Sequence, residues 1–246
     1  MPKAVAEYIK TNNLGAVDLT KRDIVSLYEE DFMKLDDTGR ATALYDAIPA
    51  QLSKNASRYR IASAIPGEKA DRVTSVVRMM NDCMAANVVY HSNDPNVGLA
   101  LTMDNERFKI YASDTGMFVT LAFKDKDFTD NIIYEKLLND KLRTNLGYVY
   151  ENVIAQMLRA AGKQLFYHTI PTSDGKKYYE IDFLITDEYK VSPIEVKSSG
   201  YKSHTSLDVF CTKFSDRVRN KYIIYTKDLK REQGIDYMPV YMTMFL

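Results

Sequence analysis

The segment KYYEIDFLITDEYKVSPIEVKS, residues 177–198, has the pattern of two β-strands joined by a tight turn. Side chains two positions apart in a strand lie on the same face. Apolar and charged residues alternate in both strands, so each strand is expected to have one apolar face and one charged face. The charged faces carry four residues: Glu180, Asp182, Glu195 and Lys197.

The turn sets which of these side chains face each other. A hairpin with a tight loop centred in DEYK pairs residues whose numbers sum to 377, which places Asp182 opposite Glu195 and Glu180 opposite Lys197. This register follows from spacing alone, and a β-bulge between the strands would break it.

Two carboxylates directly opposite each other repel by up to ~1 kcal/mol relative to a neutral pair. A cation between Asp182 and Glu195 would remove this cost, and Mg²⁺ is commonly held by one or two carboxylates together with water and phosphate oxygens. Such an ion would bind a scissile phosphate and supply a water nucleophile, and Lys197 would stabilise the developing negative charge. Without metal, the crowded acids should have raised pKa values.

A third carboxylate is expected near the same place. A helix is predicted over residues 148–161, and Glu151 lies on one stripe with Gly147, Ile154 and Leu158. Burial of Glu151 among apolar residues is costly unless the carboxylate has a partner. Either a metal ion or a salt bridge to an arginine or lysine would provide that partner.

A simpler interpretation of the four strand residues stays open. Glu180 and Lys197 could form an ordinary cross-strand ion pair, with Asp182 and Glu195 pointing into solvent from a half-exposed sheet. The E-x-K spacing by itself is a weak motif. The ordered set of helix glutamate, strand aspartate and E-x-K on the next strand is much more specific.

The rest of the chain predicts a mixed α/β protein, α+β overall, with a central sheet. We expect three parts: a helical lead over residues 1–40, a winged-helix-like domain over 41–125, and an α/β domain over 126–246. In the last part, further strands are expected at 164–169 and 221–226, with a helix at 206–214 between them and a final apolar run, PVYMTMFL.

The middle part has helices followed by a hairpin formed by VVYHS and FKIYAS, which is the element order of a winged helix. Its long helix is expected over residues 68–86. The predicted buried stripe of that helix consists of Val73, Val76, Val77, Met80, Cys83 and Met84. Off this stripe lie Arg72, Thr74, Ser75 and Arg78, which would either contact DNA or form an ordinary exposed face.

Composition bounds the class of protein. The chain has 246 residues, 46% of them hydrophobic, and 33 Lys+Arg balance 33 Asp+Glu, which excludes binding of nucleic acid by bulk charge alone. Residues 201–231 carry a local excess of five positive charges, so DNA contacts are expected there or on the long helix. Two distant cysteines, no signal peptide and no membrane-length apolar run predict a cytoplasmic protein with reduced thiols and no membrane partner.

These residues resemble the PD-(D/E)xK superfamily of restriction-endonuclease-like nucleases and Holliday-junction resolvases. Glu151 matches the helix acid of that superfamily, Asp182 its first strand acid, and Glu195 and Lys197 its E-x-K. The resemblance implies Mg²⁺ or Mn²⁺ binding by the three acids and a position for the lysine at the scissile phosphate. Ile181 stands where the superfamily usually has proline.

The whole chain resembles the C-terminal part of a prokaryotic family of predicted AAA+ ATPases, in which an ATPase domain precedes a winged helix and a nuclease-like domain of unknown function. The matching stretches are MPKAVAEYIKTNNL, IVSLYEEDFMKL, LYDAIPAQLSKN, FKIYASDTGMFVTL, GYVYENVIAQML, YEIDFLI and PIEVKS. The chain has no G-x-x-x-x-G-K-[ST], so no ATP site is expected in it.

Two functions of different classes follow. The chain is either a Mg²⁺-dependent DNA nuclease or nuclease-like module that works with an upstream AAA+ ATPase, or a non-catalytic module that binds DNA or protein with the same fold. We expect either the C-terminal portion of a longer protein or a stand-alone relative. His91, His168 and His204 are scattered without metal-ligand spacing, so a histidine-based site is not expected.

Overall fold

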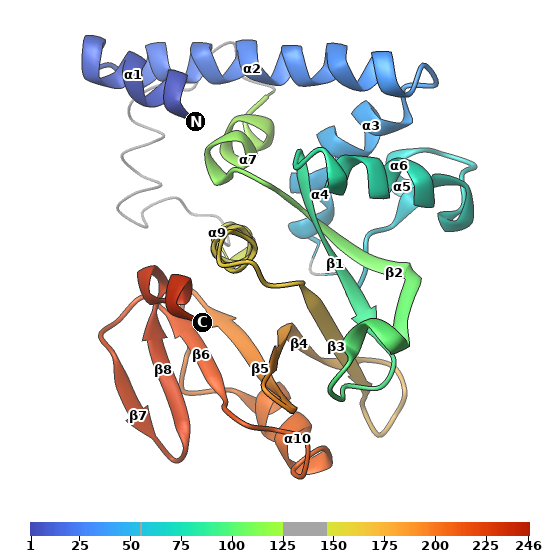
Figure 1. Ribbon diagram of the computed structural model, residues 1–246, viewed down its shortest axis with the longest axis vertical. Helices are drawn as coiled ribbons and strands as arrows, with labels where there is room; N and C mark the ends of the chain where they lie inside the picture. Colours follow the sequence, from blue (N-terminus) through green and yellow to red (C-terminus); the bar gives the residue numbers. More distant parts are fainter. Residues whose placement is uncertain (55, 125–146) are drawn as a thin grey trace.

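The computed structural model describes residues 1–54, 56–124 and 147–246, and these residues form a mixed α/β fold (Figure 1). Within them, eight strands form one sheet in the order β2-β1-β3-β4-β5-β6-β8-β7. The strands are β1 Ala86–Ser92, β2 Met103–Ala112, β3 Phe166–Pro171, β4 Tyr178–Asp187, β5 Lys190–Lys197, β6 Tyr222–Tyr225, β7 Lys230–Glu232 and β8 Ile235–Pro239. The pairs β1–β3, β5–β6 and β6–β8 are parallel, and the remaining neighbours are antiparallel.

The described α-helices are α1 Pro2–Thr11, α2 Leu14–Leu35, α3 Arg40–Asp46, α4 Ile48–Leu52, α5 Ile61–Ala64, α6 Ala70–Asp82, α7 Thr115–Ala122, α9 Gly147–Ala160 and α10 Thr205–Lys213. Helices α9 and α10 pack against different faces of this sheet. Two short 3₁₀ helices, η1 Leu99–Thr102 and η2 Val240–Phe245, complete the described elements. Among the residues described, no helix is long and apolar enough to cross a bilayer.

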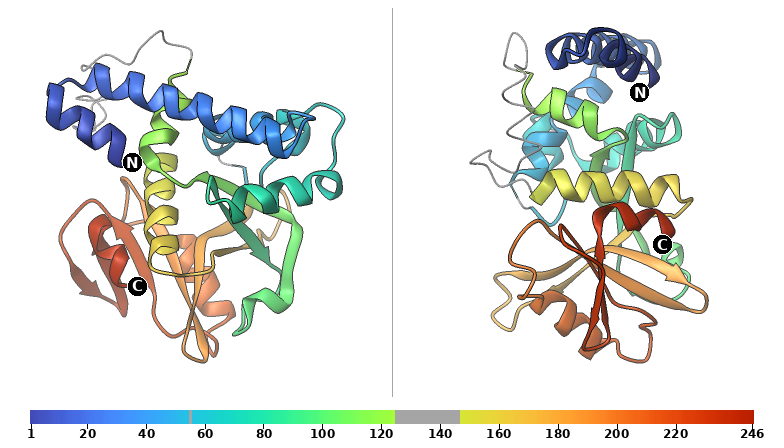
Figure 2. Two further views of the ribbon diagram at one scale, coloured as in Figure 1. Left: turned by 45° about the horizontal axis from the view of Figure 1, so that its top comes forward. Right: turned by 90° about the vertical axis from the view of Figure 1, so that its left-hand side faces the viewer.

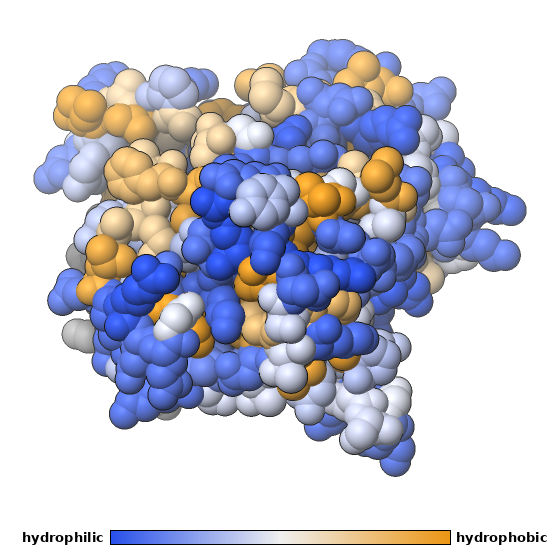
Figure 3. Space-filling view, turned by 60° about the horizontal axis from the view of Figure 1, so that its bottom comes forward, coloured by the Kyte–Doolittle hydropathy of each residue, from blue (hydrophilic) through white to orange (hydrophobic). Residues whose placement is uncertain are grey.

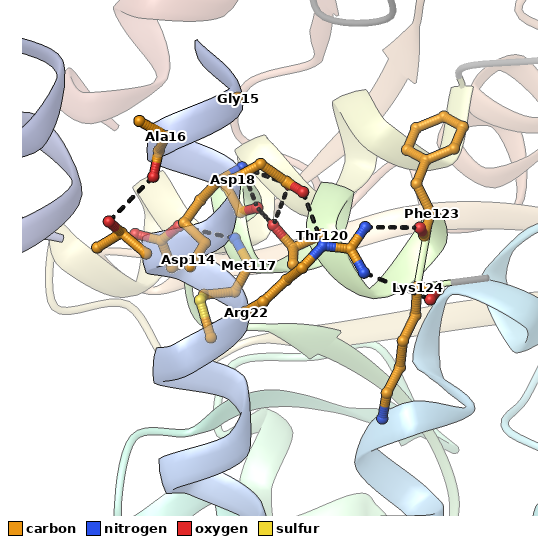
Figure 4. Close-up of polar contacts among 12 residues, drawn as sticks. Gly15, Ala16, Asp18, Arg22, Asp114, Met117, Thr120, Phe123 and Lys124 are labelled. Atoms are coloured by element: carbon orange, nitrogen blue, oxygen red, sulfur yellow. Dashed lines mark hydrogen bonds and ion pairs between the residues drawn. The ribbon is translucent and has the colours of Figure 1, made fainter. Parts of the chain in front are cut away.

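The long helix α2 lies across the top of the molecule, and α1 packs against it (Figure 1). The Asn13 side chain begins α2 by accepting a hydrogen bond from the backbone N–H of Gly15 at 2.8 Å, which is an N-cap. Polar contacts join α2 to α7 (Figure 4). Arg22 donates to the buried carboxylate of Asp18 at 2.7 Å and to the backbone carbonyl of Phe123 at 3.1 Å. These contacts attach the helical lead to the end of α7.

The predicted order of helices followed by a hairpin is present in residues 40–112. Helix α6 buries Val73, Val76, Val77 and Met80. Cys83 and Met84 were expected on the same stripe, but both side chains are exposed. The helix ends at Asp82, and Met84 has a left-handed backbone conformation with φ 56°, so the helical periodicity stops before these two residues.

The β1–β2 hairpin continues into the C-terminal sheet. Tyr90 and His91 of β1 pair in parallel with Phe166 and Tyr167 of β3. One apolar core extends from Val25 of α2 to Ile194 of β5. The predicted boundary between residues 125 and 126 lies outside the described residues, and the division into three domains stays a prediction.

Helix α9 occupies the centre of the molecule, between the N-terminal helices and the C-terminal strands (Figures 1 and 2). Ile154 and Leu158 are fully buried, as predicted from the helix stripe. On its other side, the amide of Asn152 exchanges hydrogen bonds of 2.9 and 3.1 Å with the backbone of Ala112 at the end of β2. These contacts fix α9 relative to β2 as well as to β5. The face that comes forward when the bottom of Figure 1 is turned towards the viewer is mostly hydrophilic, with apolar patches between the polar side chains (Figure 3).

Candidate functional site

The hairpin that the sequence predicts is formed by β4 and β5, which are neighbours in the sheet. The pairs Phe183–Ile194 and Ile185–Ser192 have numbers that sum to 377, so the predicted register is confirmed over this part of the hairpin. The ladder ends one pair before Asp182 and Glu195. There, the carboxylate of Asp182 accepts a hydrogen bond of 2.7 Å from the backbone N–H of Val196. Asp182 is therefore fixed against β5 by its side chain.

All four residues predicted to form the site line one pocket of about 360 Å³ between α9, β2, β4 and β5. The pocket is lined by Leu52, Ala56, Lys109, Gly147, Glu151, Tyr178, Glu180, Asp182, Glu195, Val196, Lys197 and Ser206. The structure thus brings Glu151 of α9 to Asp182 of β4 and to Glu195 and Lys197 of β5.

The carboxyl of Asp182 lies among other acids. Burial raises the pKa of its carboxyl well above the usual value, and the neighbouring carboxylates of Glu151, Glu195 and Glu180 raise it further. The ammonium of Lys109 acts in the opposite direction. The pKa of Asp182 is thus raised in the expected direction, chiefly by burial and further by the crowding of like charges that the sequence indicates.

Glu195 is buried, with 5% of its surface exposed. Its Oε1 lies 2.6 Å from Nζ of Lys197, an ion pair within the E-x-K segment. Its Oε2 is buried and has no hydrogen-bond partner among the described residues. A buried carboxylate oxygen without a partner is costly, so this atom can accept a hydrogen bond or bind a cation. The interpretation that places Glu195 in solvent is wrong.

Glu180 does not form the predicted cross-strand pair with Lys197. Its Oε1 lies 2.5 Å from Nζ of Lys109 on β2, and the same ammonium lies 3.9 Å from Oε2 of Glu151. Lys109 is 5% exposed, and the surrounding acids raise its pKa well above the usual value despite the opposing effect of burial. Lys109 is thus a charged member of the site.

The sequence pattern does not identify Lys109 as a member of the site. This lysine lies on β2 between buried Phe108 and Ile110, 71 residues before Glu180. The one available signal was a lysine on a strand whose flanking residues are apolar, which requires an acidic partner. The hairpin register could not identify that partner, because β2 and β4 are separated in the sheet by β1 and β3.

Tyr111, two residues after Lys109, fixes the third predicted acid. Its hydroxyl donates a hydrogen bond of 2.9 Å to Oε2 of Glu151, and burial next to this carboxylate raises the pKa of Tyr111 well above its usual value. The hydroxyl therefore stays protonated and acts as a donor. Glu151 has both a lysine and a tyrosine partner, which is the salt-bridge outcome expected for a helix acid near the core.

The charges of the described residues that line the pocket do not cancel. Four carboxylates, those of Glu151, Glu180, Asp182 and Glu195, face two ammonium groups, those of Lys109 and Lys197, which gives a formal net charge of −2 when all are ionised. Across residues 1–54, 56–124 and 147–246, no three His, Cys, Asp or Glu side chains are close enough together to form a metal-ligand cluster. The raised pKa of Asp182 favours its protonated, neutral form, which reduces the excess negative charge.

The two surfaces predicted to contact DNA differ in their charge. Arg72 and Arg78 of α6 are exposed. In residues 201–231, half of the eight positive side chains form ion pairs with nearby acids. These are Arg217 with Asp94, Arg219 with Asp187 and Glu188, Lys230 with Glu232, and Arg231 with Asp236. The stretch thus has less uncompensated charge than its composition indicates.

Comparison with known families gives two matches. Residues 1–127, just over half of the chain, match a domain of unknown function, DUF8612. Residues 146–243, which contain the whole α9–β8 region and the pocket acids, match another domain of unknown function, DUF4143. No curated protein matches the chain.

Proposed function

The chain belongs to the DUF8612 family, and we propose that its C-terminal region, residues 126–246, is a PD-(D/E)xK nuclease-like domain that works with the winged-helix-like region 41–125 on DNA. The observation that carries this proposal is the convergence of Glu151, Asp182, Glu195 and Lys197 on one pocket. These residues come from one helix and two adjacent strands, in the arrangement that the resemblance implies.

The donor set fits a hard divalent cation. Mg²⁺ and Mn²⁺ prefer carboxylate oxygens, and the pocket offers a net charge of −2 together with the unpartnered Oε2 of Glu195. Asp182 and Glu195 would hold the ion. Glu151 would be the third acid only after a shift of side chains, because no three acids of the described residues form a ligand cluster in this structure. When bound, Mg²⁺ would supply a Lewis acid for a phosphate oxygen and an activated water.

The protein side chains have separate roles in this proposal. Lys197 is 26% exposed and lies beside Glu195, so its ammonium is placed to stabilise negative charge that develops on a phosphate. The backbone N–H of Val196 and the hydroxyl of Tyr111 orient the carboxylates of Asp182 and Glu151. Lys109 neutralises Glu180 and also lies 3.9 Å from Glu151, whereas the Oε2 atom of Glu195 has no partner among the described residues.

The DUF4143 match supports an association with an ATPase, since this domain is found in AAA-ATPase-associated proteins. We propose that an upstream AAA+ ATPase is the physiological partner of the chain. The expectation of DNA as substrate rests on the resemblance and on the exposed arginines of α6.

A non-catalytic module is the second candidate, and Lys109 favours it. The ammonium of Lys109 lies between Glu180 and Glu151, so part of the acidic pocket is already neutralised by the protein itself. In a non-catalytic module, the acids would serve only to form these ion pairs. The two candidates differ in their response to divalent cations.

The test is a thermal-shift and calorimetric titration of the purified chain with MnCl₂ and MgCl₂, followed by cleavage assays on plasmid, duplex and branched DNA. Asp182→Asn and Glu195→Gln should lose the metal response, and Asp216→Asn, an exposed acid outside the pocket, should keep it. An equal metal response in all three variants would support the non-catalytic module. Metal binding without cleavage would mean that the ATPase partner or a particular DNA structure is required.

A further inference from the structure

A second pocket, of about 640 Å³, adjoins the acidic one and has the opposite charge. It is lined by Ala56, Ser57, Arg58, Arg60, Arg107 and Tyr178. Three arginines therefore line one pocket, and no acidic side chain is among the described residues that line it. None of the three arginines forms an ion pair with a carboxylate in the described parts of the chain. Such a cluster of cations repels itself unless an anion binds between them.

The backbone that carries Arg58 and Arg60 is fixed by the rest of the protein. The buried side chain of Gln51 accepts a hydrogen bond from the backbone N–H of Arg60 at 3.0 Å and donates one to the backbone carbonyl of Arg60 at 3.3 Å. Next to it, the backbone N–H of Tyr59 donates to the carbonyl of Phe108 on β2 at 2.7 Å, and the two rings stack. Tyr59 is buried between exposed Arg58 and Arg60, so the segment is attached to β2 while both arginines lie on the solvent side.

Arg107 is fixed from the other side of the pocket. It lies next to Phe108 on β2, and its Nη2 donates a hydrogen bond of 3.0 Å to the hydroxyl of Thr169 on β3. A guanidinium group has five donors in a fixed planar arrangement, so one bond to Thr169 leaves the others available. The Arg107 side chain and the backbone that carries the other two arginines are thus held before a ligand arrives, which reduces the entropic cost of binding.

The two pockets form one surface. Ala56 and Tyr178 line both of them. On β2, Arg107 and Lys109 are two positions apart and share a face, and on β4 Tyr178 and Glu180 do the same. On both strands, a residue that lines the basic pocket is followed two positions later by a residue that lines the acidic pocket.

This arrangement points to a ligand that carries several phosphates in a row. Guanidinium groups bind phosphate oxygens bidentately, and arginine is preferred where phosphate is recognised. Tyr178 is 52% exposed at the junction of the two pockets, where its ring can stack on a base. A polyanion whose scissile phosphate lies over the acidic pocket would place neighbouring phosphates over the arginines.

We propose that the Arg58–Arg60–Arg107 pocket binds the phosphodiester backbone of a nucleic-acid strand beside the acidic site, with Tyr178 against a base. The proposal deepens the proposed function and rests on it for the role of the acidic pocket. It differs from the sequence-based expectation, which placed DNA contacts on α6 and on residues 201–231. The arginine pocket would be the contact surface nearest to the acids.

The experiment measures binding of fluorescein-labelled DNA oligonucleotides, single-stranded and duplex, by anisotropy in EDTA at several salt concentrations. EDTA removes divalent ions, so binding by the arginines is measured independently of metal binding by the acids. The pocket variants are R58Q/R60Q and R107Q. The matched control is R72Q/R78Q, which removes the same charge from the exposed face of α6. Melting temperatures confirm that each variant is folded.

We expect R58Q/R60Q to weaken binding by about tenfold or more and to reduce the salt slope of a single strand by about 1.4, for the loss of two phosphate contacts. R72Q/R78Q should bind nearly as wild type does. The proposal would be overturned if R58Q/R60Q and R107Q bind DNA with unchanged affinity. It would also be overturned if the wild type binds no DNA at low salt. Displacement of DNA by an equal phosphate concentration of pyrophosphate would overturn the nucleic-acid assignment in favour of a small phosphate compound.

The two proposals fail in different ways. If Asp182→Asn and wild type respond equally to Mn²⁺ while R58Q/R60Q loses DNA binding in EDTA, the acidic metal site is wrong and the arginine site stands. If the metal response depends on Asp182 but the arginine variants bind DNA normally, the metal site stands and the arginine site is wrong.

Discussion

Nζ of Lys109 on β2 lies 2.5 Å from Oε1 of Glu180 on β4. The two residues belong to the regions that the sequence assigns to different domains, and their strands are not neighbours in the sheet. The ion pair therefore joins the β1–β2 hairpin to the acidic pocket directly. It makes the electrostatic state of the pocket depend on the β1–β2 hairpin.

Removing Lys109 should destabilise the protein strongly. Lys109→Met leaves Glu180, Glu151 and Asp182 without their shared cation, and loss of one partner of a buried ion pair costs about 3 kcal/mol. Equilibrium urea unfolding of wild type and variant measures this difference. Lys163→Met, at a position after α9, is the matched control and should change the unfolding free energy by less than about 0.5 kcal/mol.

A divalent cation should recover part of the loss in Lys109→Met, because it can replace the missing positive charge. Addition of Mg²⁺ or Mn²⁺ is therefore expected to raise the stability of Lys109→Met more than that of wild type. If Lys109→Met is as stable as wild type in metal-free buffer, the ion pair contributes little, and the charge balance argued for the pocket is incorrect.

Asp182→Asn should stabilise the metal-free protein. Because the folded-state pKa of Asp182 is raised, the folded protein resists ionisation of this carboxyl, and stability is lost as pH rises above the usual aspartate range. Removal of the charge should add about 1 kcal/mol at pH 7 and raise the melting temperature by about 2–4 °C. The amide oxygen of asparagine can still accept the hydrogen bond from Val196.

The pH dependence identifies the cause of the gain. Wild type should approach the stability of Asp182→Asn as the pH is lowered from 7 towards 5, because protonation of Asp182 removes its charge as the substitution does. A stability difference that stays constant over this range would point to altered packing and away from electrostatics. Asp216→Asn, the exposed control, should behave as wild type at every pH.

His91 should make the fold sensitive to acid. Burial and the nearby Arg107 lower the pKa of this imidazole to about 4, and the ring is 3% exposed. It accepts a hydrogen bond at Nε2 from the backbone N–H of Thr169 and contacts the Asn93 side-chain oxygen through Nδ1 at 3.1 Å, so the neutral ring fits both partners. A charged ring would lose the bond at Nε2.

The sign of the effect follows from the lowered pKa. Below pH 6.5 the unfolded chain takes up a proton on His91 and the folded protein does not, so stability is complete above this pH and falls as pH drops towards 4. The loss should be about 1–2 kcal/mol, and thermal melts between pH 7 and pH 4.5 measure it. His91→Gln should have a shallower pH dependence than wild type, whereas an unchanged slope would exclude His91 as the titrating group.

The β4–β5 hairpin could be predicted because its information is local. A period of two and a short turn fix both the register and the shared face of Asp182 and Glu195. The stripe of α9 placed Glu151 correctly for the same reason. Lys109 and the Arg58–Arg60–Arg107 pocket could not be found in this way, since they depend on how β2 and the segment before α5 are brought beside β4.

The errors also have physical causes. Cys83 and Met84 continue the apolar period of α6 in sequence, but the helix ends at Asp82 and β1 begins at Ala86, so the pattern extends beyond the helix that produces it. The predicted pairing of Glu180 with Lys197 assumed that the ladder continues past Phe183. A closer lysine from another strand and the side-chain bond of Asp182 to Val196 replace that pairing.

Lys197 and Glu195 are adjacent in the site but should respond differently to substitution. Glu195→Gln removes a carboxylate from the proposed metal site, so both the metal-induced stabilisation and any DNA cleavage should be lost. Lys197→Met removes the ammonium that lies 2.6 Å from Oε1 of Glu195, which frees this oxygen for the cation. Metal-induced stabilisation should therefore be kept or increased in Lys197→Met, while cleavage falls by about 100-fold or more because charge on the phosphate is no longer stabilised.

Lys190→Met, at the start of the same strand, is the matched control for Lys197→Met and should keep both properties. The readouts are the shift in melting temperature with MnCl₂ and the initial rate of DNA cleavage under the conditions in which the wild type is active. A saturating metal should stabilise wild type by about 3 kcal/mol at a concentration 100 times its dissociation constant. Loss of the metal response in Lys197→Met would assign the lysine to the structure of the metal site, and unchanged cleavage in this variant would remove it from the reaction.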